Sequence, residues 1–124
     1  MKNHSPGFLA LITEAKKTVP EITPQELKRL IADNKPCSII DVREEHEWAD
    51  GRIMTAIHLS KGVIERDIEK TIPDTNTKIV LYCRGGNRSL LAAENLQKMG
   101  YKHVYSLAEG SAGWLEAGYE LVSK

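Results

Sequence analysis

The sequence has no excess of charge of either sign and very little cysteine. Its 124 residues include 17 basic and 17 acidic side chains, so the formal net charge is zero. This balance excludes the strong overall basic field with which many proteins bind nucleic acid. Two cysteines are too few for the disulfide framework of a small secreted domain. The length suffices for one domain with an ordinary hydrophobic core.

Long hydrophobic runs are also absent. Near the N-terminus, the apolar run from Phe8 to Ile12 is followed at once by Glu14, Lys16 and Lys17. Such a run is too short for the core of a signal peptide or for a membrane span, so we expect a cytoplasmic protein with no membrane partner. No group of histidines and cysteines has zinc-ligand spacing, and we expect neither a metal nor a cofactor.

Apolar runs and helical spacings alternate along the chain. Residues 7–18 have the pattern of a short amphipathic helix within an N-terminal extension, residues 1–19. Beyond it, Thr23 and Glu26 form a capping-box pattern that predicts a helix start. The patterns predict strands over 38–42, 56–59, 78–82 and 103–107, and helices over 24–34, 44–49, 63–72, 90–99 and 110–117, the last with Trp114 and Leu115 facing inward. This alternation is typical of an α/β fold, here a small parallel sheet flanked by helices on both faces.

The heptapeptide Cys83–Ser89 carries the clearest chemical signal. It reads CRGGNRS and lies between the predicted strand 78–82 and the predicted helix 90–99. In an open parallel sheet, ligands bind beyond the carboxyl ends of the strands, and the start of a helix offers unpaired N–H groups to an anion. A thiolate is stabilised in such surroundings and acts as a nucleophile. We therefore interpret Cys83 as a reactive cysteine and not as an ordinary buried core residue.

The residues that follow the cysteine suit an anionic substrate. Arg84 and Arg88 can hold oxyanions through forked hydrogen bonds, although Arg88 has the alternative of pairing with a carboxylate and bracing the loop. Gly85 and Gly86 permit the unusual backbone angles through which several N–H groups converge on one point. Asn87 also tolerates the left-handed region of backbone conformation.

Two further residues have competing interpretations. Ser89 is expected to cap the following helix, with a hydroxyl that faces the sulfur as the alternative. Cys37 precedes a predicted core strand, so we expect a small buried hydrophobic residue. The alternative is a resolving thiol that forms a disulfide with the reactive cysteine.

With these residues in place, the chain resembles the single-domain rhodaneses, a family of sulfurtransferase modules. The resemblance extends over most of the chain beyond the N-terminal extension, and four patches agree in order and spacing. The patches are Ile22-Thr23-Pro24 with Glu26-Leu27; Ile40–Glu44 with Glu47-Trp48, Gly51–Ile53 and Ala56–Leu59; Tyr82–Ser89; and Val104–Leu107 with Gly110 and Trp114.

The resemblance implies a rhodanese-like domain over residues 20–122 and a sulfur-transfer reaction. Cys83 matches the cysteine that takes a sulfane sulfur from a donor such as thiosulfate, holds it as a persulfide and passes it to cyanide or a thiol. Residues 84–88 would form the loop around the terminal sulfur. The implied partners are a small-molecule donor and acceptor, with thioredoxin or glutathione as cellular acceptors. Asp41 and Arg43 would form a buried ion pair that supports the site.

Three positions depart from the family pattern. Arg52 stands where the family often has histidine, and Thr55 and Glu109 stand where it often has glycine. Because these positions lie outside the cysteine loop, we expect them to alter local turns and not the chemistry.

Two other functions compete with sulfur transfer. Cysteine phosphatases and arsenate reductases place five residues between a cysteine and an arginine, whereas here Ser89 occupies that place and Arg88 comes one position earlier. A non-catalytic binding or regulatory module is the other alternative, although inactive relatives typically lose the cysteine that this chain retains as Cys83.

Overall fold

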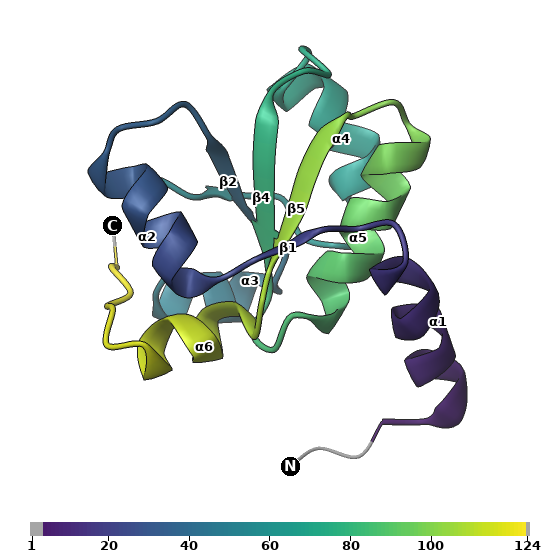
Figure 1. The fold of residues 1–124 in the computed structure, drawn as a ribbon, viewed down its shortest axis with the longest axis horizontal. Helices are drawn as coiled ribbons and strands as arrows, with labels where there is room; N and C mark the ends of the chain where they lie inside the picture. The colour runs from purple at the N-terminus through teal and green to yellow at the C-terminus, as the bar shows by residue number, and fades with distance from the viewer. Residues whose placement is uncertain (1–3, 124) are drawn as a thin grey trace.

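The structure, a computed structural model, describes residues 4–123. These residues contain one five-stranded parallel sheet in the order β1-β5-β4-β2-β3, with helices on both faces (Figure 1), which confirms the predicted α/β class. None of the helices within this range is long and apolar enough to cross a bilayer. The strands are β1 (Glu21–Ile22), β2 (Ser38–Asp41), β3 (Ile57–His58), β4 (Lys78–Tyr82) and β5 (His103–Leu107), and the helices are α1 (Pro6–Lys16), α2 (Pro24–Ala32), α3 (Glu45–Asp50), α4 (Ile64–Thr71), α5 (Asn87–Lys98) and α6 (Gly110–Glu116).

Apart from shifts of one or two residues at the ends of elements, three features differ from the sequence prediction. The patterns do not predict β1, because a two-residue edge strand is too short to show an alternation; it pairs with β5. Helix α5 begins at Asn87 and not at residue 90, so its first turn lies inside the cysteine loop. Trp114 is buried as predicted but Leu115 is 50% exposed, because neighbouring residues of a helix point in different directions.

Alternate residues of the central strand β4 face opposite layers of helices. Ile79, Leu81 and then Cys83 contribute to one hydrophobic cluster, whereas Val80 and Tyr82 contribute to the other. A strand covered on both faces has a continuous apolar sequence, as residues 79–82 of β4 do. Because all the strands are parallel, their carboxyl ends lie at one edge of the sheet, and Cys83 follows directly after β4 at that edge.

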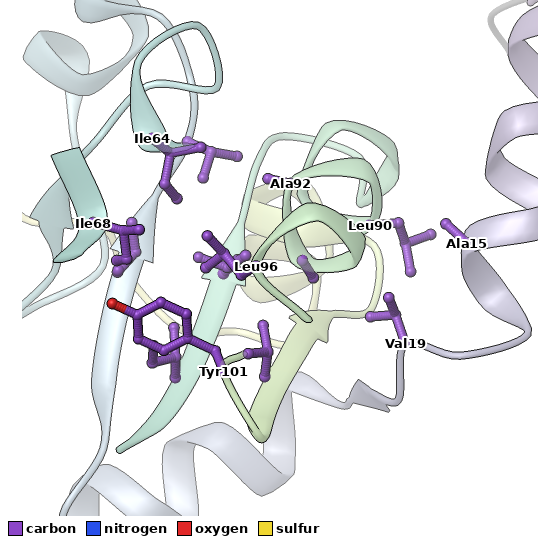
Figure 2. Packing of buried hydrophobic residues seen from close by; sticks show 14 of the residues in the cluster. Ala15, Val19, Ile64, Ile68, Leu90, Ala92, Leu96 and Tyr101 are labelled. Atoms are coloured by element: carbon purple, nitrogen blue, oxygen red, sulfur yellow. The ribbon is translucent and has the colours of Figure 1, made fainter. Parts of the chain in front are cut away.

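The larger cluster packs α1, α4 and α5 against one face of the sheet. Ile64 and Ile68 extend from α4 toward the centre of this layer (Figure 2). On the other side of α5, Leu90 faces Ala15 and Val19 from the N-terminal segment (Figure 2). All of these side chains are buried, so the N-terminal segment shares one continuous core with the sheet.

The smaller cluster lies under α2 and α6 on the opposite face. It includes Leu27 of α2, Trp114 of α6 and the ring of Tyr82. The predicted capping box starts α2, because the Glu26 N–H donates to Thr23 Oγ1 (3.1 Å) and the Thr23 N–H donates to Glu26 Oε1 (2.9 Å). The capping box thereby fixes the start of α2, whose Leu27 belongs to the same buried cluster as Trp114 of α6.

Helix α1 lies along the outer side of α5 and runs in the same direction (Figure 1). Contacts at both ends define this arrangement: His4 meets Asn87 at the start of α5, and the Gln97 side-chain amide near its end donates to the Thr18 carbonyl (2.8 Å). Between them, Ile12 is buried against the core. The predicted helix over 7–18 is therefore present, slightly shifted toward the N-terminus.

We predict that α1 is part of the cooperative folding unit. Ile12 is 6% exposed, so Ile12→Ala should lower the free energy of unfolding by about 2–4 kcal/mol through lost burial and a residual cavity. Leu11→Ala, at a neighbouring position that is 56% exposed, is the control and should change it by less than about 0.5 kcal/mol. Urea unfolding followed by tryptophan fluorescence measures both variants. Equal, small effects would contradict the docking of α1.

Candidate active site

The thiol of Cys83 lies just beyond the carboxyl end of β4 and is 1% exposed. Two backbone donors point at its sulfur: the Gly86 N–H, with N and Sγ 3.1 Å apart, and the Ser89 N–H, at 3.4 Å. The Ser89 hydroxyl oxygen lies 3.5 Å from the same sulfur. This geometry favours negative charge on the sulfur, because each N–H presents its positive end to it.

The sulfur takes the place of a capping side chain for α5. The N-cap residue is Gly86, which has no side chain to accept hydrogen bonds from the first turn. Ser89 is the third residue of α5, and the N–H at this position ordinarily donates a hydrogen bond to the oxygen of a capping side chain. Here the Ser89 N–H points at Cys83 Sγ instead. The strand end thus supplies the cap from outside the helix.

The prediction that Ser89 caps α5 is wrong, and the alternative orientation is the one observed. Ser89 lies in the first turn of α5, is fully buried and donates to the Gly86 carbonyl (3.2 Å). Its hydroxyl also shares a hydrogen bond with the Ser106 hydroxyl of β5 (2.7 Å). The helix starts earlier than predicted because Gly86 adopts a left-handed conformation that ends the turn.

The two glycines of the loop have different roles. Gly86 has φ of +98°, and a Cβ there would lie 3.2 Å from the Glu109 nitrogen. Gly85 has no positive φ, and a Cβ there would meet nothing within 4 Å. Asn87 is the first residue of α5 and does not use the left-handed region that its residue type tolerates. Backbone freedom is therefore required at Gly86 alone within this loop.

The start of α6 holds the carbonyl groups of the loop. The Ser111 N–H donates to the Cys83 carbonyl (2.8 Å), and the Ala112 N–H donates to the Arg84 carbonyl (3.0 Å). A Cβ at Gly110 would lie only 2.3 Å from the Cys83 carbonyl oxygen, and this glycine has φ of +56°. With its carbonyls turned toward α6, the loop directs later N–H groups toward the sulfur.

Two departures from the family pattern fall at left-handed backbone positions. Thr55 has φ of +68° and Glu109 has φ of +61°. Both stand where the family often has glycine, and a side chain is strained at a left-handed backbone position. The expectation that these two positions affect local turns stays a prediction.

Arg88 follows the bracing alternative, because it pairs with Glu47 of α3. Nη1 and Nη2 of the arginine donate to Oε1 and Oε2 of the carboxylate at 2.9 and 3.2 Å. Hydrogen bonding from Arg88 lowers the pKa of Glu47 to about 2. The same pair raises the pKa of Arg88 above its ordinary value. The sequence analysis places Glu47 in a patch of the family resemblance but assigns it no role in the site, and its spacing after Glu44 indicates only a capping box.

Arg84 is the free cation of the loop within residues 4–123. Its side chain lines the cleft over Cys83, its residue is exposed, and it forms no ion pair with another described residue. A guanidinium with unpaired donors can bind an oxyanion through a forked contact. The sequence analysis gives the two loop arginines the same possible role. In the structure Arg88 is paired with a carboxylate, whereas Arg84 forms no ion pair among the described residues.

Asp41 and Arg43 form the buried ion pair expected at the end of β2. Arg43 Nη2 lies 2.7 Å from Asp41 Oδ2, and the Arg43 backbone N–H also donates to this carboxylate at 2.9 Å. The Tyr82 hydroxyl donates to Asp41 Oδ2 (2.7 Å) and accepts from the Ile53 N–H (3.0 Å). Burial, with the adjacent Asp41, raises the pKa of Tyr82 above its ordinary value. The network ties β2, β4 and the segment after α3 together beneath the cleft.

The cleft over the thiol has a volume of about 1020 Å³. It is lined by the loop residues Cys83, Arg84, Gly85, Asn87 and Arg88, by Glu47 and Ala112, and by His4, Ser5 and Phe8 from the N-terminal extension. The last three residues are absent from the sequence prediction, since their place depends on the packing of α1 against α5.

Cys37 is remote from Cys83. It precedes β2 at the amino end of the strands, because Ser38 pairs with Ile79 near the start of β4, whereas Cys83 follows the far end of β4. Burial raises the pKa of the Cys37 thiol. The described geometry therefore does not bring the two cysteines together for an intramolecular disulfide.

A parallel α/β domain with a strand-end thiol inside a helix-starting loop is the architecture of rhodanese-like proteins. A model of the Rhodanese-like domain family matches residues 23–117, and the chain belongs to this family. Helix α1 lies outside the matched range.

Relatives named for sulfur chemistry are similar to this chain. A sulfurtransferase of Allochromatium vinosum is 31% identical, over 85% of this chain and 96% of that protein. A candidate sulfur carrier protein of Bacillus subtilis, YrkF, is 28% identical over 82% of this chain, which spans only 54% of that relative's length. At the level of the family, these names support rhodanese-type sulfur transfer.

A solved structure from Rhodopseudomonas palustris resembles the whole chain. That protein, RPA3614, is named as a possible tyrosine phosphatase of unknown function. It is 27% identical, covers 98% of both chains and has a TM-score of 0.87. The match extends over α1, which the family model leaves out.

We predict that the Glu47–Arg88 pair stabilises the folded state by an amount that depends on pH. Because the folded-state pKa of Glu47 is depressed to about 2 from its ordinary 4.5, its stabilisation is fully present above pH 4.5 and is lost as the pH falls toward 2. Glu47→Gln keeps the hydrogen-bonding shape and removes the charge. Urea midpoints of wild type and variant should differ at pH 6, and this difference should narrow steadily as the pH falls toward 2. The exposed neighbour Glu45→Gln is the control, and a gap for Glu47→Gln that stays constant with pH would contradict the assignment.

Proposed function

We propose that this protein is a sulfurtransferase that moves a sulfane sulfur through a persulfide on Cys83. The observation that carries the proposal is the convergence of the Gly86 and Ser89 N–H groups on the Cys83 sulfur. Such donors stabilise both an attacking thiolate and the anionic persulfide that replaces it. The family-level sulfur chemistry of its relatives supports the same reaction class.

The proposed reaction has two displacement steps. With thiosulfate as the donor, the Cys83 thiolate attacks the outer sulfur, a new S–S bond forms, and the old S–S bond breaks as sulfite leaves with the electron pair. In the second step, cyanide or a thiolate attacks the terminal sulfur of the persulfide. The bond to Cys83 Sγ breaks, the thiolate is restored, and thiocyanate or a new persulfide is released. No external oxidant or reductant is needed.

The two arginines of the loop have different proposed roles. We assign Arg84, which lines the cleft without a carboxylate partner among the described residues, to binding the charged part of the donor. Arg88 acts as a positioning residue, since Glu47 holds its guanidinium and so anchors the first turn of α5 to α3. We propose that thiosulfate or an organic persulfide donates the sulfur and that a thiol such as glutathione or thioredoxin accepts it in the cytoplasm.

The phosphatase alternative finds less support in the loop. Only four residues separate Cys83 from Arg88, and both forked donors of Arg88 are engaged by Glu47. A phosphoryl group needs such donors for its own oxygens. A non-catalytic binding or regulatory module would not need N–H groups that point at the Cys83 sulfur.

Intact-mass measurement tests the proposal. After incubation with thiosulfate, wild-type protein should gain the mass of one sulfur atom and lose it again on addition of cyanide. Cys83→Ser should show no gain, while the matched control Cys37→Ser should behave as wild type. A gain that persists in Cys83→Ser would contradict the role of this cysteine. No gain on wild type from thiosulfate or from glutathione persulfide, with turnover of an aryl phosphate instead, would favour the phosphatase function.

A further inference from the structure

The N-terminal extension supplies one wall of the cleft over Cys83. His4, Ser5 and Phe8 line this cleft together with the cysteine loop, although the extension lies outside the range matched by the family model. Helix α1 is held in place by the buried side chains of Ile12 and Ala15. The helix next to which this wall lies is therefore packed on the core of the domain.

The rim formed by the extension is aromatic and is tied to the loop. The rings of His4 and Phe8 lie with their centroids 5.0 Å apart at an angle of 54°. The Asn87 side-chain amide donates to Nε2 of His4, with the two nitrogens 3.3 Å apart. Because Asn87 begins α5, one hydrogen bond links the rim to the loop that surrounds the sulfur. Ser5 caps α1 by accepting from the Phe8 N–H (3.3 Å), which fixes the turn that carries both rings.

The size and lining of the cleft fit an organic substrate. Pockets that bind small organic molecules range over roughly 300–1,000 Å³, and this cleft measures about 1020 Å³, far more than thiosulfate or cyanide requires. The aromatic rim offers apolar contact area, and the exposed Arg84 offers a partner for a carboxylate. Since Arg88 neutralises Glu47, the lining favours a negatively charged ligand.

We propose that His4 and Phe8 bind the organic part of a carboxylate-bearing, low-molecular-weight persulfide and make it a better sulfur donor than thiosulfate. This inference rests on the proposed sulfur transfer through Cys83. The thiolate attacks the terminal sulfur of R–S–S⁻, a new S–S bond forms at Cys83, and the old S–S bond breaks as R–S⁻ leaves with the electron pair. His4 and Phe8 contact R and do not touch the reacting sulfur atoms.

The test compares two donors on three variants. Sulfur transfer to cyanide is measured with glutathione persulfide and with thiosulfate for wild type, His4→Ala, His4→Ala/Phe8→Ala and Leu11→Ala. The double variant should lose about tenfold more kcat/KM with glutathione persulfide than with thiosulfate, mainly through KM, because the lost contacts hold R before and during the reaction. His4→Ala should also lower kcat/KM more with glutathione persulfide than with thiosulfate, and it leaves the core contacts of Phe8 intact.

Leu11→Ala, on the same helix and 56% exposed, is the control and should leave both donors unchanged. Equal losses with both donors in His4→Ala would assign the rim a purely structural role and overturn the proposal. An unchanged donor ratio in every variant would overturn it as well. Failure of the sulfur-transfer function itself looks different, since wild type would then turn over neither donor.

Discussion

The site depends on how the carbonyl groups of the cysteine loop are held. Two N–H groups at the start of α6 bind the carbonyls of Cys83 and Arg84, and this fixes the orientation of the peptide planes that follow. The N–H groups of Gly86 and Ser89 can then converge on one sulfur atom. Only a glycine at position 110 lets α6 approach this closely, since a Cβ would overlap the Cys83 carbonyl oxygen.

A layer of charge pairs supports this arrangement from beneath and from the side. The buried Asp41–Arg43 pair, with the Tyr82 hydroxyl, joins β2 to β4 below the loop, while Glu47 and Arg88 join α3 to the first turn of α5. A buried ion pair such as Asp41–Arg43 contributes little net stability but strongly disfavours arrangements that separate its partners, and the partly buried Glu47–Arg88 pair adds a forked contact between two helices. Their value here is positional, because the strand end and the helix start must stay in register for the sulfur to cap α5.

Four of the five strands, the place of Cys83 at a strand end and the Asp41–Arg43 pair could be predicted from the sequence. Each of these has a local signature: an apolar run, a glycine-rich turn, or a motif at a strand end. It cannot predict that Arg88 is engaged and Arg84 free, because the carboxylate that decides this, Glu47, lies on another element. The place of His4 and Phe8 in the cleft likewise depends on α1 packing against α5. Ser89 does not cap α5 as predicted, because the helix already starts at Asn87 and the sulfur of Cys83 accepts the capping hydrogen bond.

The rate of persulfide formation in Gly110→Ala tests whether the close approach of α6 positions the N–H groups around the sulfur. This variant, folded by circular dichroism at the assay temperature, should form the Cys83 persulfide at least about tenfold more slowly than wild type. The reason is that the added Cβ forces α6 away from the loop, so that the N–H groups no longer point at the sulfur. Gly85→Ala, where a Cβ meets open space, should react at the wild-type rate. Equal rates for Gly110→Ala, Gly85→Ala and wild type would show that the close approach of α6 does not position these N–H groups.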